Sequence, residues 1–481
     1  ISKKNFHKTR SWKVKIFIYL SFANHGIYNV ITAPKTPITH LITMNKRAFS
    51  APGKALLAGG YLVLDPKYQS YVVALSSRMH SVVQFKESEQ FKVKVLSAQF
   101  DNDTWEYLVE KDEQENLIPK EINGKNNPFV EKTIFNVLNY FKHASKDTKY
   151  DVSIEIFSDS GFHSKDESVT KSNDKKTFNF HKKTITKVPK TGLGSSACLV
   201  TVLTSALTSV YLGDEFDVKN ESILSLVHNL AQVAHCQAQG KVGSGFDVAA
   251  ATFGSILYQR FSPDLINELP NIKEVKTDYS ESLYKLVKDT NWNFTHKRIH
   301  LPKGLKLVMG DVKSGSETTK MVAKVKKWYQ DNLPRSEEVY NKINQGNIKF
   351  IESLDTLNKT KDTTLIDQID NKDIESDVLV EARAAIEQIR ENFRIITKEG
   401  EVDVEPLVQT ELLNNVLNQN GVLTAMIPGA GGYDAIAIIV TENCEIQKSN
   451  DEIFEKVTFL DLKQEDLGIL EEHPDYYENL L

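Results

Sequence analysis

The sequence is poor in cysteine and has no two cysteines close together. Its 481 residues include three, Cys198, Cys236 and Cys444, and no C-x-x-C pair occurs. This spacing argues against a disulfide framework and against a zinc cluster. The cysteine usage favours a reducing compartment, so we expect a cytoplasmic protein.

The chain also lacks a dominant charge and a long, purely apolar run. Its 59 Lys and Arg residues against 64 Asp and Glu give a net charge of −5, which argues against a surface built mainly for duplex nucleic acid. The most apolar segment, "ACLVTVLTSALTSVYL" from Ala197, contains five Thr and Ser residues and fits a buried helix better than a membrane span. We therefore expect neither nucleic acid nor a membrane as a partner. On grounds other than charge, we expect a small-molecule substrate and a monomer or weak homodimer.

The first 43 residues contain no acidic residue. They are basic and include the apolar stretch "VKIFIYL", which is too short to span a bilayer. Met44 directly precedes "NKRAFSAPGKALLAGG", where domain-like sequence starts. We interpret residues 1–43 as a basic N-terminal extension, either a presequence or, as we favour, an artefact of where the reading frame was opened.

The remaining sequence divides into two parts. Short strand-like runs such as "YVVALSS" and "SVVQF" lead, and helices are predicted for "PFVEKTIFNVLNYF", for the apolar segment from residue 197, and for "SILSLVHNLAQVAHCQAQG". The polar segment 158–183 is predicted to be a hairpin inserted away from any site. We expect a first domain over 44–262, a connecting insert over 263–300, and a second domain over 301–481 that contains charged helices and then a strand, a glycine turn and a strand.

The stretch "PKTGLGSSA", residues 189–197, joins a glycine-rich turn to the buried helix. Such a junction brings unpaired backbone N–H groups and the positive end of the helix dipole together, which makes an anion site. No Lys-Ser or Lys-Thr follows the second glycine, so this is not the common nucleotide-binding loop. The alternative is a tight turn followed by a serine-capped helix.

Three further motifs carry weaker signals of the same kind. "PGAGGYDA" at 428–435 has more glycine than a hairpin turn needs, Lys54 follows the Pro-Gly turn of "SAPGK", and Asp247 follows the glycine-serine turn of "GSGFD". Each also has an ordinary structural explanation: a tight hairpin, a solvated lysine and an N-capping aspartate. Together, in this order, the four motifs are a strong signal.

The order APGK, GLGSSA, Gly-Ser-Gly-x-Asp and PGAGG resembles that of the GHMP small-molecule kinases, over about residues 45–445. Within this family "KVPKTGLGSSA" and "GDVKSGSETTKMV" are most similar to the eukaryotic branch that acts on 5-phosphomevalonate. Mevalonate kinases tend to carry Gly-Glu-His where this chain has Gly60 and Tyr61 after Gly59. That difference makes a mevalonate kinase the second choice, ahead of a GHMP-fold sensor that binds ligands without turnover.

The resemblance implies the GHMP kinase fold, an α/β domain plus an α+β ferredoxin-like domain with the active site between them. It implies ATP and Mg²⁺ as cofactors. The reaction would transfer the γ-phosphoryl group of ATP to the phosphate of 5-phosphomevalonate, giving ADP and 5-diphosphomevalonate in the mevalonate route to isoprenoids and sterols.

The resemblance also implies roles for individual residues. Lys54 and Asp247 would be catalytic, and Ser195 and Ser196 would contact the metal. The ATP-binding loop (189–199) would use Pro189, Lys190, Thr191, Gly192, Leu193, Gly194, Ser195, Ser196 and Ala197. The acceptor would be bound by Lys54, Tyr61, Ser244, Ser316 and Gly431, with Ser314 and Thr318 as further candidates.

Two polar clusters remain outside the predicted site. No acidic residue lies between Glu221 and Asp247, where several family members place a magnesium-binding glutamate. A stripe of amides and imidazoles occupies that region, and we expect it to be a polar contact face rather than a metal site. On a later helix, arginines at spacings of 7 and 4 surround Glu387 and are expected to form a solvated ion-pair face. These residues are His228, Gln232, His235 and Gln239 in the stripe, and Arg383, Arg390 and Arg394 in the arginine cluster.

Overall fold

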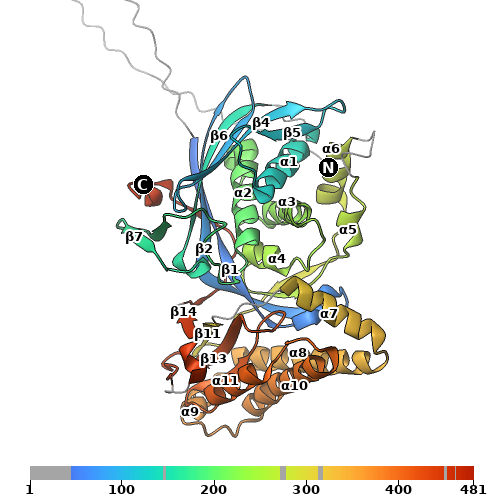
Figure 1. Cartoon of the computed structure of the whole chain (residues 1–481), viewed down its shortest axis with the longest axis vertical. Helices are drawn as coiled ribbons and strands as arrows, with labels where there is room; N and C mark the ends of the chain where they lie inside the picture. Colours follow the sequence, from blue (N-terminus) through green and yellow to red (C-terminus); the bar gives the residue numbers. More distant parts are fainter. Residues whose placement is uncertain are drawn as a thin grey trace, which may run out of the picture. The chain divides into compact units, whose positions relative to one another are not determined.

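Two β-sheets organise the part of the chain that the structure describes (Figure 1). In this computed structural model that part comprises residues 45–144, 148–270, 278–312, 318–448, 452–460 and 462–480. Residues 44–481 form one compact unit. The predicted extension 1–43 and Ser316 lie outside the described residues.

The first sheet is built around one long central strand, β2. It follows the order β10-β9-β2-β6-β3-β4-β5, with β1 and β15 pairing with β2, and β16 pairing with β1. Its strands are β1 (Asn45–Ala58), β2 (Gln69–Glu87), β3 (Lys92–Ser97), β4 (Asp103–Lys111), β5 (Leu117–Glu121), β6 (Tyr150–Ser158), β9 (Ile256–Gln259), β10 (Thr295–Arg298), β15 (Gln464–Glu465) and β16 (Leu470–Glu472).

The sequence predicted two short strands where the structure has β2 alone. The polar residues that suggested a break are buried and bonded inside the sheet: Arg78 is 7% exposed and its Nε donates to Ser50 Oγ at 2.8 Å. The pairing of β1 with β2 shifts register between Pro52 and Gly53, which lets the ladder continue past these bulky side chains.

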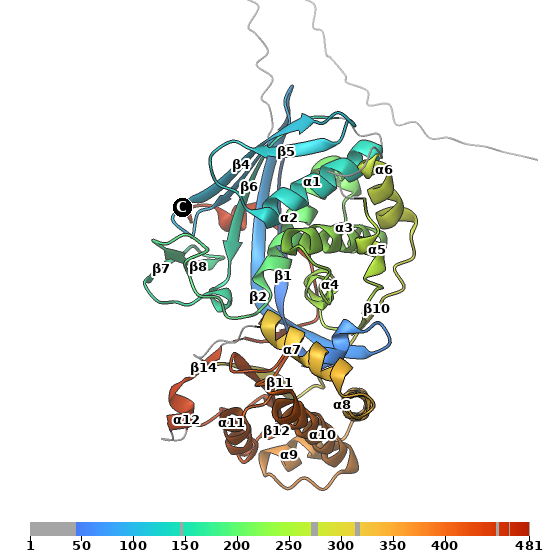
Figure 2. The same ribbon diagram turned by 45° about the vertical axis from the view of Figure 1, so that its right-hand side comes forward.

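Four helices cover one face of the first sheet (Figure 2). They are α1 (Pro128–His143), α2 (Ser195–Leu212), α3 (Glu221–Gln239) and α4 (Phe246–Phe253), and the first three confirm the predicted helices. A 3-10 turn, η3 (Gly213–Glu215), extends α2. Within the described chain, Ser195–Glu215 is the one helix long and apolar enough to cross a membrane, and 83% of its apolar window is buried inside the protein, as expected of a core helix.

The second sheet is small and entirely antiparallel. It has the order β12-β13-β11-β14, formed by β11 (Leu305–Val312), β12 (Val422–Met426), β13 (Ala435–Thr441) and β14 (Val457–Leu460). In chain order this is 2-3-1-4, the ferredoxin-like arrangement. The helices α7 (Thr318–Asp331), α8 (Arg335–Lys359), α9 (Thr364–Asp370), α10 (Asp377–Gly400) and α11 (Leu407–Leu417) belong to this part, followed by α12 (Glu452–Glu455). The expected combination of α/β and α+β architecture is confirmed.

The predicted connecting insert and the predicted extent of the second domain both need correction. The segment 263–300 contains α5 (Asp264–Asn267), α6 (Tyr279–Tyr284) and η4 (Lys285–Asp289), and it ends in β10, which pairs with β9 in the first sheet. Residues assigned to the second domain also return to the first sheet, because β15 pairs with β2 and β16 with β1. Strands of two to four residues are too short to show an alternating pattern, so they could not be predicted from the sequence.

Three short turns and a hairpin complete the described fold. The turn η1 (Gly60–Leu64) follows β1, and η2 (Ser160–Phe162) follows β6. The predicted hairpin is confirmed as β7 (Ser168–Ser172) and β8 (Thr177–His181), which form a sheet of their own. The turn η5 (Pro474–Tyr477) lies near the end of the described chain.

Candidate active site

The predicted anion-binding turn ends at an uncapped helix. Gly194 is the N-cap of α2, with a left-handed backbone (φ 82°) and no side chain to accept a hydrogen bond from the first turn. Ser195 and Ser196 lie inside the helix, so the alternative of a serine-capped helix is wrong. The free N–H groups of the first turn and the helix dipole are therefore available to an anion.

A second helix begins at the same place. Gly245 is the N-cap of α4, again left-handed (φ 77°) and without a capping side chain, and Asp247 is the second residue of that helix. A Cβ added at Gly194 would lie 3.8 Å from Cβ of Asp247, so the two helix starts converge. Asp247 is not an N-cap: its Oδ1 accepts from the adjacent N–H of Val248 at 3.0 Å.

Lys54 reaches the same point from β1. Its Nζ donates to the carbonyl of Gly192 at 3.0 Å, and its backbone N–H donates to Leu193 O at 3.1 Å. A Cβ at Gly194 would lie 3.1 Å from Cε of Lys54. The structure thus brings together three segments of the sequence that carry the two predicted catalytic residues and the glycine turn.

Burial and charge act in opposite directions on Lys54. Burial lowers the pKa of its ammonium group, while the Asp247 carboxylate opposes that shift. Cys198, one turn into α2, donates its thiol to Pro52 O at 3.1 Å, and burial followed by the Asp247 charge raises its pKa to about 12. The site therefore contains the protonated thiol of Cys198, together with Lys54 and Asp247, whose opposite charges interact.

The predicted metal ligands differ in their partners. Ser196 Oγ lies 3.1 Å from His235 Nε2, whereas the Ser195 hydroxyl makes no hydrogen bond to the described residues and is partly exposed. No group of three His, Cys, Asp or Glu side chains that could hold a metal occurs among the described residues. The Ser195 hydroxyl, with Ser196 next to it, fits Mg²⁺, because this ion commonly uses one or two protein oxygens together with phosphates and water.

The second glycine loop packs against the end of β1. Gly429 N–H donates to Leu56 O at 3.2 Å, and Gly432 N–H donates to Val404 O at 2.9 Å. The Tyr61 hydroxyl donates to Ala430 O at 2.6 Å, and burial, then Tyr340, raises its pKa. Tyr61, predicted to bind substrate, therefore ties η1 to the loop that contains Gly431.

Ser244 lies just before the Gly245 cap. Its carbonyl accepts from the Tyr258 hydroxyl at 2.9 Å, and its side chain is partly exposed. The structure thus places Ser244 beside the start of α4. Thr318, the first residue of α7, lines the cavity described next.

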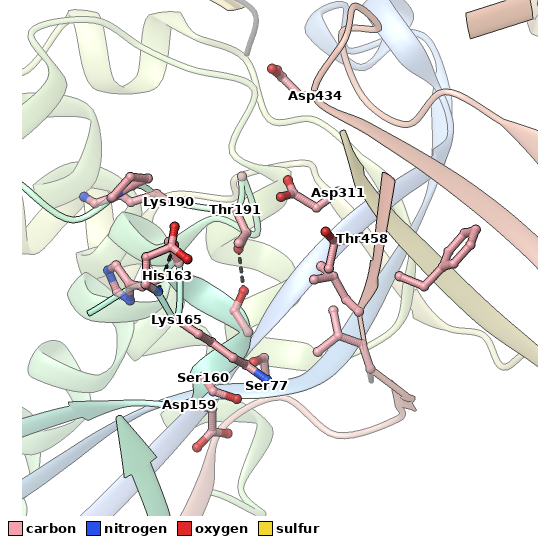
Figure 3. Close-up of a pocket in the computed structure, with 18 of the residues that line it drawn as sticks. Ser77, Asp159, Ser160, His163, Lys165, Lys190, Thr191, Asp311, Asp434 and Thr458 are labelled. Carbon is pink, nitrogen blue, oxygen red and sulfur yellow. Dashed lines mark hydrogen bonds between the residues drawn. The ribbon is translucent and has the colours of Figure 1, made fainter. Parts of the chain in front are cut away.

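A cavity of about 1160 Å³ adjoins the glycine turn (Figure 3). Residues 189–192 line it on one side, and the second sheet supplies Asp311, Asp434 and Thr458 on the other. The base of the β7–β8 hairpin contributes further polar side chains. The main ones are Asp159, Ser160, His163, Lys165 and Asp166.

These hairpin-base residues were missed by the sequence analysis, which set segment 158–183 aside as an insertion. The tip is exposed as expected, but the base is part of the wall: Thr191 N–H donates to Phe162 O at 3.2 Å, and Ser164 N–H donates to Pro189 O at 2.9 Å. A possible signal was the high density of Lys and His between residues 163 and 190 directly before the glycine turn.

The arginine cluster is paired but not solvated. Arg390 is fully buried, and its Nη2 lies 2.9 Å from Glu405 Oε1, while Glu405 is itself 2% exposed. The expected pairing with the partly exposed Glu387 also occurs, at 3.3 Å from Arg390. The prediction of a solvated face is therefore wrong for Arg390, because Glu405, fifteen residues ahead, folds back beneath it.

Comparisons with known proteins agree with this geometry. Residues 167–255 match the family of GHMP kinases N terminal domains. The chain is 42% identical over 446 residues to a phosphomevalonate kinase of Candida albicans, covering 90% of this chain and 100% of that protein. It is 32% identical over 441 residues to a phosphomevalonate kinase of Aspergillus fumigatus, covering 83% of this chain and 88% of that one.

A solved structure shares the fold. It is the Streptococcus pneumoniae phosphomevalonate kinase in complex with phosphomevalonate and AMPPNP, with a TM-score of 0.55 and 16% identity over 87% of this chain and 99% of that chain. This structural match shows the shared fold. The fungal relatives, which match this chain along most of their length, show the family. The chain belongs to the phosphomevalonate kinase family of GHMP kinases.

Proposed function

We propose that the protein transfers the γ-phosphoryl group of ATP to the phosphate of 5-phosphomevalonate, giving ADP and 5-diphosphomevalonate. The observation that supports this most directly is the convergence of two uncapped helix starts with Lys54 at Gly194. Phosphoryl transfer depends mainly on positioning and charge stabilisation, which this arrangement supplies.

The phosphates of ATP are assigned to the turn 192–197. The first-turn N–H groups of α2 would bind the β- and γ-phosphate oxygens, helped by the helix dipole. Glycine at 194 allows the left-handed turn and leaves room for the Lys54 side chain.

Lys54 and Asp247 are assigned to the transferring group. The Lys54 ammonium would neutralise charge on the phosphoryl oxygens, and its bond to Gly192 O orients it toward the turn. The acceptor phosphate is already ionised near neutral pH, so Asp247 does not have to remove a proton. We assign it to orienting Lys54 and the acceptor oxygen.

Magnesium is assigned to the start of α2. The Ser195 hydroxyl, with Ser196 beside it, is the protein oxygen placed to hold it. When bound, the ion would stabilise the negative charge of the ATP phosphates.

The nucleoside is assigned to the cavity that continues from residues 189–192. Its volume of about 1160 Å³ and its mixed lining of Lys190, His163, Asp311 and Asp434 suit a large polar ligand (Figure 3). The acceptor is assigned to two positions outside the cavity lining: Ser244, which directly precedes the start of α4, and Gly431, whose loop packs against the end of β1.

The test is an ADP-release assay with mevalonate and 5-phosphomevalonate offered separately. We expect ADP with 5-phosphomevalonate alone. Turnover of mevalonate instead would make the protein a mevalonate kinase. Ligand binding without ADP release from either acceptor would point to a sensor.

Site variants test the assigned roles. Lys54→Met and Asp247→Ala should fold normally and lose about 100- to 1,000-fold in kcat. Lys86→Met, which removes an exposed lysine from the neighbouring strand β2, is the matched control and should retain wild-type kcat. Unchanged kcat in Asp247→Ala would remove that carboxylate from the mechanism.

We also propose that the protein works in the cytoplasm as a monomer or weak dimer. Its three cysteines are all free thiols, which suits a reducing compartment. Imaging of a fluorescent fusion tests the location, and sedimentation velocity across a concentration series tests the assembly.

A further inference from the structure

One helix contacts the starts of both helices that form the site. The α3 stripe of His228, Gln232, His235 and Gln239 faces α2 and α4, and its first three members are buried, with at most 4% exposed. None of these side chains has a role in the function proposed above.

Gln232 holds the beginning of α4. Its Nε2 donates to Gly245 O at 2.7 Å, and the same carbonyl accepts the helical N–H of Ala249 at 3.0 Å. The first turn of α4, which carries Asp247, is therefore fixed both by its own helix and by α3.

A hydrogen-bond chain fixes the orientation of the Gln232 amide. Asn229 Nδ2 donates to Val287 O at 3.1 Å, so its Oδ1 accepts from His228 Nδ1 at 2.9 Å. His228 Nε2 must then accept from Gln232 Nε2 at 3.1 Å. Both amide hydrogens of Gln232 are thereby used, one toward His228 and one toward Gly245.

His235 holds the beginning of α2. Its Nε2 accepts from the Ser196 hydroxyl at 3.1 Å and from the exposed Gln239 at 3.3 Å. Because the amide nitrogen of Gln239 can only donate, His235 Nε2 is the acceptor in that contact, and the Ser196 hydroxyl donates to the same nitrogen.

The three helices also pack closely at this junction. A separate core cluster joins α2, α3 and α4 through small side chains, namely Ala197, Val200, Ala231, Ala234 and Val248. Small residues let the backbones approach, so a shift of α3 is passed directly to both helix starts.

We propose that Gln232 and His235 are positioning residues for phosphoryl transfer, which set the spacing between Asp247 and the phosphate-binding start of α2. This inference rests on the proposed function. Its consequence is that losing either side chain lowers kcat even though neither touches a substrate, because small displacements of reacting groups have large effects on rate.

The first experiment compares two glutamines of α3. Gln232→Leu removes the bond to Gly245, while Gln237→Leu removes bonds of the same kind to Tyr279 and Asn136 on another face of the helix. We expect kcat to fall about 10-fold or more in Gln232→Leu, with KM for ATP little changed, and to stay at the wild-type value in Gln237→Leu. Equal kcat in the two variants would overturn the role of Gln232.

The second experiment is a double-mutant cycle of Ser196→Ala and His235→Leu. It tests the positioning role of His235 independently, so the proposal can still be refuted if Gln232→Leu does not fold. If His235 acts through Ser196, the double variant loses no more kcat than the worse single variant. His235→Gln, which keeps an acceptor, should recover most of the activity lost in His235→Leu. Independent, multiplicative losses or no recovery would contradict the inference.

The two proposals fail in different ways. All rates are measured with whichever acceptor the wild-type protein turns over. A wild-type protein inactive on 5-phosphomevalonate would refute the proposed function, whereas the ratios between variants test the positioning role for any acceptor.

Discussion

Gly192 and Gly194 share a left-handed backbone but have different neighbours. Their φ angles are 71° and 82°. A Cβ at Gly192 would meet nothing within 4 Å, whereas one at Gly194 would lie 3.1 Å from Lys54 Cε. We expect both alanine variants to lose about 1–2 kcal/mol of stability from backbone strain, and only Gly194→Ala to displace Lys54.

Steady-state kinetics and urea unfolding separate these two effects. Gly194→Ala should lower kcat about 10-fold or more, while Gly192→Ala serves as the strain-matched control with a smaller loss. Similar kcat values in the two variants would show that the fit between Gly194 and Lys54 does not matter for turnover.

The second glycine loop offers an equivalent comparison. A Cβ at Gly431 would lie 2.3 Å from Val404 O, while one at Gly429 would meet nothing within 4 Å, although both residues have positive φ. Gly431→Ala should therefore lose about 1–3 kcal/mol beyond the loss in Gly429→Ala, because backbone must move to make room. Urea unfolding of both variants measures this difference.

At the level of single residues, the sequence identified the glycine turns and Lys54 and Asp247, because glycine and isolated charged residues in turns stand out in a pattern. It did not identify their contacts. Tyr61 was expected to bind substrate, yet its hydroxyl bonds to Ala430 O, a partner 369 residues away. The sequence did single out Gln232 and His235 as part of a polar contact face, but it did not identify their partners, which lie on two other helices.

Among the secondary-structure elements, α10 is anchored by a buried charge. Arg390 donates to Glu405 Oε1 from both Nε and Nη2, at 3.1 and 2.9 Å, and both residues are buried. Glu405 follows Val404, whose carbonyl accepts from the glycine loop. Replacing Glu405 by Leu removes the buried counter-charge of Arg390, leaves it the half-exposed Glu387 as partner, and should cost about 3–5 kcal/mol of stability.

The control for this prediction lies on the same helix. Glu387 also pairs with Arg390 and Arg394 but is about half exposed, with 46% of its side chain accessible. Glu387→Leu should therefore change stability by about 0–1 kcal/mol. Thermal unfolding of both variants tests the difference. Equal losses of stability would mean that burying the Arg390–Glu405 pair does not make its loss more costly than that of the exposed pair.

Long elements were predictable and short ones were not. The helices α1 and α3 show apolar periodicity over 16 and 19 residues, and α2 is apolar on nearly every face over 18 residues. Helix α3 ends at the predicted glycine, Gly240, with φ 67°. The strands β10, β15 and β16 have two to four residues each, and tertiary pairing alone defines them. The length of β2 was missed because its buried polar residues resemble a turn.

Across the whole molecule, distant segments assemble each part of the site. The cavity wall combines the hairpin base, the glycine turn and the second sheet, which lie more than 100 residues apart at their extremes. No local pattern predicts such a juxtaposition. The resemblance to a known family predicted the two-domain arrangement with the site between the domains. The structure showed that the hairpin base, Asp311 and Asp434 line the cavity.

The C-terminal segment closes the first sheet through a buried charge cluster. His80 is 1% exposed, with Nε2 3.1 Å from Asp159 Oδ1 and Nδ1 3.4 Å from Glu472 Oε1. Tyr477 OH lies 2.9 Å from the same Nδ1, and Lys176 pairs with Glu472. Asp159 also lines the large cavity, so this cluster links the end of the chain to the cavity wall.

The charges of this cluster make stability depend on pH in two opposite ways. Burial would lower the pKa of His80, but Asp159 and Glu472 raise it overall, so its contribution is complete below the unfolded value of about 6.5 and is lost as pH rises through the folded pKa. Burial would raise the pKa of Glu472, but His80 and Lys176 hold it below its usual range. Its contribution is complete above about 4.3 and is lost as pH falls.

We therefore expect this cluster to contribute most between about pH 4.3 and 6.5. Urea midpoints measured from about pH 2 to about pH 9 should show a smaller alkaline decline in His80→Gln and a smaller acid decline in Glu472→Gln than in the wild-type protein. His473→Gln, in the same segment but exposed, is the control and should follow the wild-type profile. An unchanged alkaline decline in His80→Gln would mean that the imidazole is not charged in the folded protein, and the C-terminal segment would then be held by the pairing of β16 with β1, by the packing of Tyr477 and Leu480, and by ion pairs that do not involve His80.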